Sequence, residues 1–119
     1  MRKIEFYHLD NGKCPVEEYL DTLSDKEVEK IFFVLDLIEI IPLVPGKFFK
    51  KLTSTNDIWE VRVKYSGNIF RLLGFLDGKN LIILNHAFTK KTQKTPAKDI
   101  KKSEQRKKDY FSNSQRRLT

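Results

Sequence analysis

The sequence predicts an α+β fold in the order β-α-α-β-β-β-α, in which an antiparallel sheet carries a helical hairpin on one face. Three observations predict this class. Two segments within residues 15–41 repeat their apolar residues at helical spacing. Three short segments within residues 58–88 have the alternating or continuously apolar pattern of strands. A third helical segment follows Pro96 and is strongly basic, so a C-terminal helix completes the fold.

The N-terminal part should contain one strand and the helical hairpin. Residues 3–8 alternate in polarity, as a half-buried strand does. Pro15 suits the first position of a helix, because its missing N–H group would have no helical partner there. Ser24 and Glu27 have the spacing of a capping box, which begins a second and strongly apolar helix. Pro42 ends that helix by a steric clash with the residue before it.

The sheet is expected mainly in the middle of the chain. Residues 42–55 are predicted to form a loop, and residues 58–64 then alternate as a strand. Residues 69–76 are almost continuously apolar, as in a central strand. The Asp77-Gly78 pair favours a tight hairpin turn, so residues 81–88 should form the last strand beside it.

The two faces of this sheet should differ. We take Trp59 to mark the core face, which places Glu60, Arg62 and Lys64 on the opposite face, because residues two apart in a strand share a face. The helical hairpin covers only the core face. We therefore expect part of the opposite face to be open to solvent and lined by polar side chains.

The last helix is expected to run from Thr95-Pro96 to about Phe111. Its few residues suited to burial are Ala97, Ile100, Tyr110 and Phe111, so its docking should be weak. Residues 1–111 are thus predicted to form a single domain, and residues 112–119 a disordered basic tail.

Composition excludes several classes of protein. The chain has 119 residues and one cysteine, Cys14, which excludes an intrachain disulfide and a zinc site built from cysteines. Two histidines and scattered acids have no metal-ligand spacing, so we expect no metal and no cofactor. No apolar run approaches the ~20 residues that cross a bilayer, and the first residues do not resemble a signal peptide. A cytoplasmic protein without membrane contact is expected.

The charge is unevenly distributed along the chain. Residues 1–85 carry 12 positive and 13 negative charges, whereas residues 86–119 carry 11 positive and 3 negative. Such asymmetry favours binding to a polyanion, most often nucleic acid, whose phosphates release counterions when they are neutralised. A solubilising basic tail explains the composition equally well.

One set of cationic side chains indicates where the positive charge would gather on the sheet. Arg71 interrupts the apolar central strand, and taken alone it is best explained by an ion pair with Glu60 or Asp77. However, adjacent elements of the sheet would bring further cations to the same rim: Lys50, Lys51, Arg62, His86, Lys90, Lys91 and Lys94. Cations without matching carboxylates are costly unless an anion completes the cluster. A phosphodiester is the obvious anion.

The histidines have weaker claims. His86 lies near the end of the last predicted strand, where a lone histidine is more often a hydrogen-bonded structural residue than a catalyst. Its reference pKa of ~6.5 nevertheless makes it the side chain best suited to proton transfer near neutral pH. His8, on the first strand, has an even weaker claim to a catalytic role.

These residues carry a family resemblance. The stretch IWEVRVKYSGNIFRLLGFLDGKNLIILNHAFTKKTQKTP, with Lys50-Lys51 before it and a basic helix after it, resembles the phage Gp49-like, HigB-type toxins of the RelE/ParE superfamily. The resemblance extends over nearly the whole chain. It implies the toxin of a type II toxin–antitoxin pair, neutralised by an antitoxin that is often a helix-turn-helix protein. Most RelE- and HigB-like members cleave mRNA on the ribosome.

The implied reaction is metal-independent attack of an RNA 2′-OH on the adjacent phosphate. We expect Arg62 and Arg71 to hold the phosphorane, Lys90 and Lys91 to add positive charge, and His86 to transfer a proton. A lysine whose pKa is lowered by neighbouring cations is a rival for the last role. Contacts to RNA or to the ribosome are expected from Lys50, Lys51, Lys64, Lys94, Lys98, Lys101, Lys102 and Arg106.

Two other functions remain open at this stage. The ParE branch inhibits DNA gyrase without catalysis, and a degenerate relative would only bind nucleic acid. The open basic face favours the RNA branch, because gyrase inhibition does not itself require a phosphate-handling centre.

Overall fold

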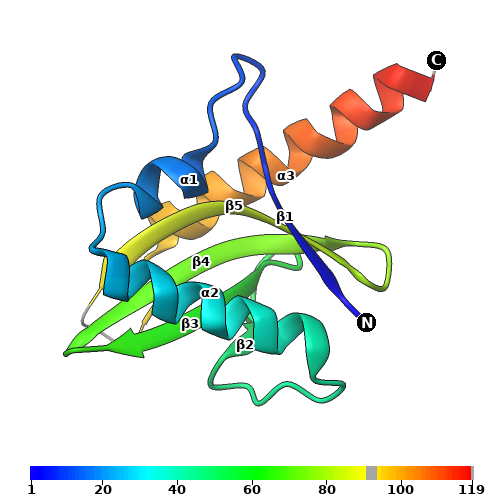
Figure 1. Cartoon of the computed structure of the whole chain (residues 1–119). Helices are drawn as coiled ribbons and strands as arrows, with labels where there is room; N and C mark the ends of the chain where they lie inside the picture. The colour runs from blue at the N-terminus through cyan, green and yellow to red at the C-terminus, as the bar shows by residue number, and fades with distance from the viewer. Residues whose placement is uncertain (91–93, 119) are drawn as a thin grey trace.

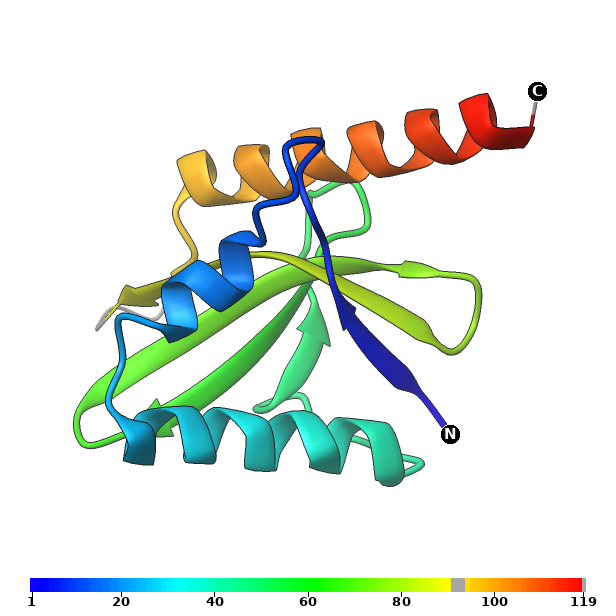
Figure 2. The same ribbon diagram turned by 45° about the horizontal axis from the view of Figure 1, so that its top comes forward.

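The computed structural model describes residues 1–90 and 94–118 and has the α+β architecture that the sequence predicts. A five-stranded sheet has the strand order β1-β5-β4-β3-β2, with helices on both faces (Figures 1 and 2). The elements in chain order are β1 (Lys3–Phe6), α1 (Pro15–Leu20), α2 (Asp25–Ile40), β2 (Phe49–Lys51), β3 (Trp59–Tyr65), β4 (Asn68–Asp77), β5 (Leu81–Lys90) and α3 (Ala97–Leu118).

Two features of the sheet differ from the prediction. First, the segment predicted as a loop contains the edge strand β2, whose three residues are too few to show a period in the sequence. Phe49 anchors it by stacking on Trp59, with ring centroids 4.8 Å apart. Second, the sheet is not wholly antiparallel, because β1 pairs with β5 in parallel. The long connection through α1, α2 and the other strands returns the chain in the same direction, which allows this pairing.

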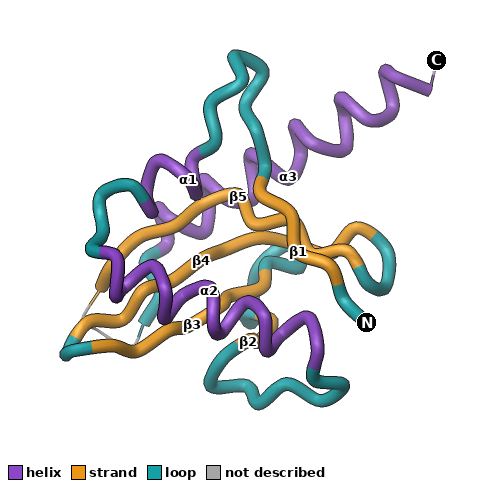
Figure 3. Tube along the Cα trace, in the orientation of Figure 1, coloured by secondary structure: helices purple, strands orange, loops and turns teal. Residues whose placement is uncertain are grey.

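The helix α2 forms as the sequence predicts. The Ser24 hydroxyl accepts a bond from the Glu27 N–H, and the Glu27 carboxylate accepts one from the Ser24 N–H, at 3.3 and 2.8 Å. Its apolar stripe is buried against the sheet. The residues of this core are Ile31, Val34, Leu35 and Ile38 from α2 and Val61, Val63, Phe70 and Leu72 from the strands. The long loop that follows α2 leads to β2 (Figure 3).

Helix α3 packs on the opposite face of the sheet, part of which the sequence predicts to be open to solvent (Figure 2). Tyr110 and Phe111 pack on Tyr7, Phe75 and Ile83 in a second, smaller core. The helix also continues past Phe111, where the sequence predicts its end, to Leu118. No glycine or proline follows Phe111 to end the helix.

A bulge in β5 shapes the face under α3. Leu73 pairs with His86, but the next residue, Gly74, pairs with Leu84, so Asn85 is an extra residue in β5. Glycine is required at position 74, because a side chain there would overlap the backbone of Ile83. The bulge delivers two consecutive polar residues, Asn85 and His86, to partners on α3.

The length and apolar character of the helices decide whether any of them could cross a bilayer. Within the described residues, none combines the length and the apolar character of a bilayer span.

Candidate nucleic-acid interface

The two predicted arginines are neighbours on one face of the sheet. Arg62 and Arg71 are directly paired residues of β3 and β4. Both contact one carboxylate, because Arg71 Nη1 lies 3.1 Å from Glu60 Oε2 and Arg62 Nε lies 3.5 Å from Glu60 Oε1. The alternative in which Arg71 pairs with Glu60 is therefore confirmed. The prediction that these arginines lack a matching carboxylate is wrong, since residue spacing shows which face a side chain is on but not what it contacts.

Thr95 completes this group, which we call the Glu60 network (Glu60, Arg62, Arg71 and Thr95). Its hydroxyl donates to the Glu60 carboxylate and accepts a bond from Arg71 Nη1 at 3.4 Å. Glu60 and Arg71 are fully buried. Burial makes such a pair sensitive, because removal of one partner leaves the other charge in a low-dielectric interior. The network thus anchors the segment before α3 to the sheet.

His86 is held between two groups of α3. Its Nε2 lies 2.7 Å from Asp99 Oδ1, and its Nδ1 lies 3.5 Å from Arg106 Nη1. A guanidinium can only donate, so Nδ1 accepts and the Nε2–H donates to Asp99. Burial lowers the pKa of His86, and hydrogen bonding to Asp99 opposes this shift. With both ring nitrogens engaged, His86 fits the hydrogen-bonded structural role better than proton transfer.

The guanidinium of Arg106 also bonds to groups within the fold. It donates to the backbone oxygen of Asn85 at 2.8 Å, and burial lowers the pKa of its guanidinium. Asn85 itself exchanges two hydrogen bonds with Ser103, at 2.6 and 3.0 Å. The sequence predicts Arg106 as a phosphate contact, but in the structure its guanidinium donates to the bulge of β5. The expected weak docking of α3 is therefore wrong.

The lysines, in contrast, remain at the surface. Lys64 and Lys90 are on either side of Ile69 in the strand register, and Lys50 is beside Glu60 on the edge strand. Among the described residues, no ion pair involves any of the five lysines around the Glu60 network. We call this set the basic rim: Lys50, Lys64, Lys90, Lys94 and Lys98.

The remaining predicted cations are dispersed. Lys51 pairs with Trp59 in the register, so it lies on the face opposite to Lys50, and its ammonium is 2.7 Å from Asp57. This bond lowers the pKa of Asp57. Lys101 and Lys102 are exposed on α3. Lys91 lies outside the described residues.

An aromatic residue that the sequence did not single out lies in this region. Phe88 pairs with Arg71 in the register and is half-buried, with its ring centroid 5.6 Å from that of His86. Exposed aromatic faces beside cations are the usual platforms for unpaired bases. Its position two residues before Lys90 on the same strand face is the signal that could have identified it.

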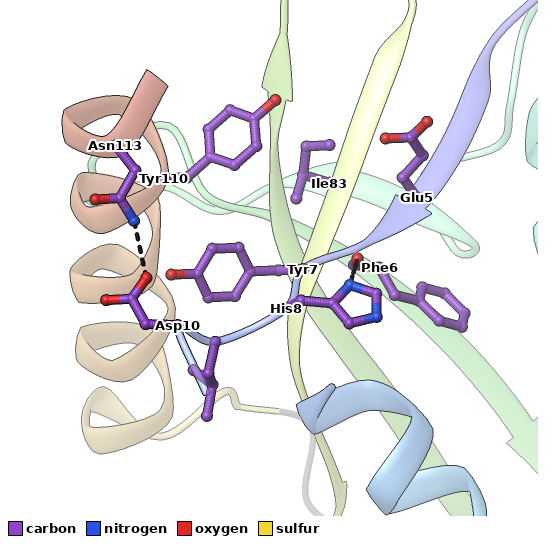
Figure 4. Close-up of a pocket in the computed structure, with 9 residues that line it drawn as sticks. Glu5, Phe6, Tyr7, His8, Asp10, Ile83, Tyr110 and Asn113 are labelled. Carbon is purple, nitrogen blue, oxygen red and sulfur yellow. Dashed lines mark hydrogen bonds between the residues drawn. The ribbon is translucent and has the colours of Figure 1, made fainter. Parts of the chain in front are cut away.

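Two hollows lie away from the basic rim. One, of about 340 Å³, is formed by residues around β1 and the end of α3, including Tyr7, His8, Asp10 and Tyr110 (Figure 4). The other, of about 730 Å³, lies between α1, α2 and β1, and we call it the acidic groove. Its lining combines apolar Phe6, Leu20, Leu23, Val28 and Phe32 with acidic Glu17, Asp21, Asp25 and Glu29.

A grouping of metal-ligand residues is present that the sequence analysis did not predict. Ligand atoms of His8, Cys14 and Glu17 all lie within 4.8 Å of one another. Residue spacing alone does not reveal this grouping, because the turn after β1 folds His8 back onto the start of α1.

The fold and the basic rim define the class of the molecule, a small α+β protein with one polar, basic sheet face. The model of the family described as phage-derived protein Gp49-like matches residues 18–108. The chain therefore belongs to the Gp49-like family, a family of RelE/HigB-like toxins, and the resemblance seen in the sequence is confirmed. No curated protein matches the chain.

Proposed function

We propose that the chain is the toxin of a type II toxin–antitoxin pair and that it cleaves mRNA on the ribosome without a metal ion. One observation carries this proposal. Lys50, Lys64 and Lys90 lie on the same sheet face as the Glu60 network, Lys94 and Lys98 flank Thr95 in the chain, and none of the five has an ion pair among the described residues. Lysines gathered in this way favour a ligand with many phosphates, such as an RNA backbone, because their binding releases the counterions that the phosphates hold.

The spacing of the rim suits a single strand of RNA. Lys64 and Lys90 are two strand spacings apart, or roughly 10 Å. Phe88 lies two residues before Lys90 on the same face of β5 and offers a ring on which a base can stack. Contacts of this kind hold the RNA backbone and tolerate many sequences, as expected for a toxin that acts on many messages.

In the proposed reaction a 2′ oxygen attacks the adjacent phosphorus and the bond to the 5′ oxygen breaks. A base takes the 2′ proton, and an acid gives a proton to the departing 5′ oxygen. A lysine of the basic rim is now the better candidate for proton transfer, because both nitrogens of His86 have partners. Arg62, at the margin of the Glu60 network with its side chain 13% exposed, is the candidate phosphate contact, and Arg71 positions it.

The test compares two matched double charge reversals during induction in cells. Lys64→Glu with Lys90→Glu should relieve growth arrest and abolish the new mRNA 5′ ends that the wild type produces. Lys26→Glu with Lys79→Glu changes the charge equally at exposed sites away from the rim, so it should remain toxic. Circular dichroism of both purified variants checks that each is folded.

Other outcomes identify the alternatives. Toxicity with intact mRNA and inhibited supercoiling by purified gyrase would replace the proposal by gyrase inhibition. Normal growth on induction of the folded wild type would indicate an inactive nucleic-acid-binding relative.

The acidic groove is the surface that we propose for the antitoxin, which we expect to be a helix-turn-helix protein. Its lining combines four carboxylates with apolar side chains and, among the residues that the structure describes, includes no lysine or arginine. A basic amphipathic helix has the complementary surface. If the product of the neighbouring reading frame binds there, Asp21→Lys with Asp25→Lys should weaken the complex at least tenfold. Glu18→Lys with Asp36→Lys, exposed and outside the groove, should leave its affinity unchanged.

A further inference from the structure

A cluster of three chemically different side chains lies at the junction of β1 and α1. His8 follows β1, Cys14 precedes α1, and Glu17 lies in the first turn of that helix. Their ligand atoms are within 4.8 Å of one another. Figure 3 shows the loop between β1 and α1 projecting beyond the sheet, and the three residues lie near its two ends.

The hydrogen bond of the His8 ring is the one that a metal-binding histidine requires. His8 Nδ1 lies 3.1 Å from the backbone oxygen of Phe6 (Figure 4). A carbonyl oxygen only accepts, so Nδ1 carries the proton and Nε2 keeps its lone pair. Metal-binding histidines usually donate their second N–H to a carbonyl or carboxylate in this way, which fixes the tautomer and the ring orientation.

The separations are compatible with one small ion. Zinc bonds of about 2.0–2.3 Å require ligand atoms roughly 3.3–3.8 Å apart in a tetrahedral site. The observed limit of 4.8 Å exceeds this by about 1–1.5 Å. His8 and Glu17 are both exposed, so rotation of their side chains can close the gap while the buried Cys14 stays in place.

We propose that His8, Cys14 and Glu17 bind one Zn²⁺ ion, which clamps the end of β1 to the start of α1. Thiolate, imidazole and carboxylate together favour zinc over magnesium or calcium, which prefer oxygen ligands alone. The two anionic ligands balance the charge of the ion. Asp10 is engaged elsewhere, by a bond of 3.1 Å from Asn113, so water takes the fourth position.

The site is independent of the proposed action on RNA. None of its three residues belongs to the basic rim or to the Glu60 network. The zinc ion has a stabilising role here, because an ion that binds only the folded chain shifts unfolding to higher temperature.

The experiment uses the full chain, stripped of metal with a chelator and titrated with Co²⁺ and then Zn²⁺. One equivalent of Co²⁺ should give thiolate-to-cobalt charge transfer and tetrahedral d–d absorption, which one equivalent of Zn²⁺ removes. Zinc should also raise the Tm. Cys14→Ser should abolish the charge-transfer band, and His8→Gln or Glu17→Gln should weaken binding at least tenfold.

Two controls make the result decisive. Asp10→Asn changes an acid of the same loop that is not a proposed ligand, so it should bind Co²⁺ like the wild type. His8→Gln replaces an exposed side chain and should fold even if Cys14→Ser does not. Absence of the charge-transfer band at one equivalent, or zinc affinity unchanged in the folded His8→Gln protein, would overturn the proposal.

Discussion

The two faces of the sheet are covered by helices in different ways. On the α2 face, Ile31, Val61 and Leu72 belong to one apolar core. On the α3 face, a smaller core around Phe75 is accompanied by buried polar contacts, among them those of Glu60 with Arg71 and of His86 with Asp99. Apolar burial depends mainly on the area removed from water, whereas each polar contact depends on a specific partner. The α3 face should therefore be the more sensitive to single polar substitutions and to pH.

The largest effect is expected at the Glu60 network. Glu60→Leu removes the carboxylate that contacts the buried Arg71, so it should lower the free energy of unfolding by about 3–5 kcal/mol. Urea titration measures the loss. The double variant Glu60→Leu with Arg71→Met removes both charges and should cost clearly less. Equal losses in the two proteins would show that packing, and not the charge, is responsible.

A truncation in the apolar core tests the other side of the comparison. Leu72→Ala should cost about 2–5 kcal/mol, because it removes buried methyl groups and leaves a cavity. The loss should be the same at pH 5.5 and pH 8. Ile40→Ala, at a position 65% exposed, is the control and should change stability little. A strongly pH-dependent loss at Leu72 would contradict the contrast between the faces.

The two hydrogen bonds between Asn85 and Ser103 should contribute less to the free energy of unfolding. Asn85→Ala leaves the Ser103 groups without these partners and should cost about 1–3 kcal/mol. Ser103→Ala alone and the double variant complete a double-mutant cycle. If the two single losses simply add in the double variant, the pair makes no joint contribution to the docking of α3.

The smallest effect is expected from the titration of His86. Burial lowers its pKa in the folded state, so below about pH 6.5 the unfolded chain binds more protons than the folded one. Stability should therefore fall as the pH falls through and below this value, and be fully present above it. His86→Gln should reduce this dependence, measured by urea titration from pH 7.5 to 5. His8→Gln, at an exposed position, should leave it unchanged in metal-free protein.

The contrast also explains how much of the fold could be predicted. The capping box of Ser24 and Glu27 and the periods of α2 and β3 are local, so they were visible in the sequence. The strand β2 was missed because three residues show no period. The docking of α3 was missed because it depends on the bulge at Asn85, a long-range feature of the pairing between β4 and β5.

Prediction of the site met the same limit. Strand spacing placed Glu60, Arg62 and Lys64 on one face, and it would also have separated Lys50 from Lys51 had it been applied to β2. It could not show that Glu60 lies between the arginines. Nor could it bring Thr95 to that carboxylate, because 35 residues separate them in the chain.

The pairing of β1 with β5 has a consequence for synthesis. The strand β1 pairs with β5, from which residues 7–80 separate it in the chain, so the sheet cannot be completed until translation has reached the end of β5 at Lys90. Contacts between such distant segments form slowly, because a long loop must close first. A nascent chain that stops short of this point therefore lacks both the strand that pairs with β1 and part of its lysine-rich surface.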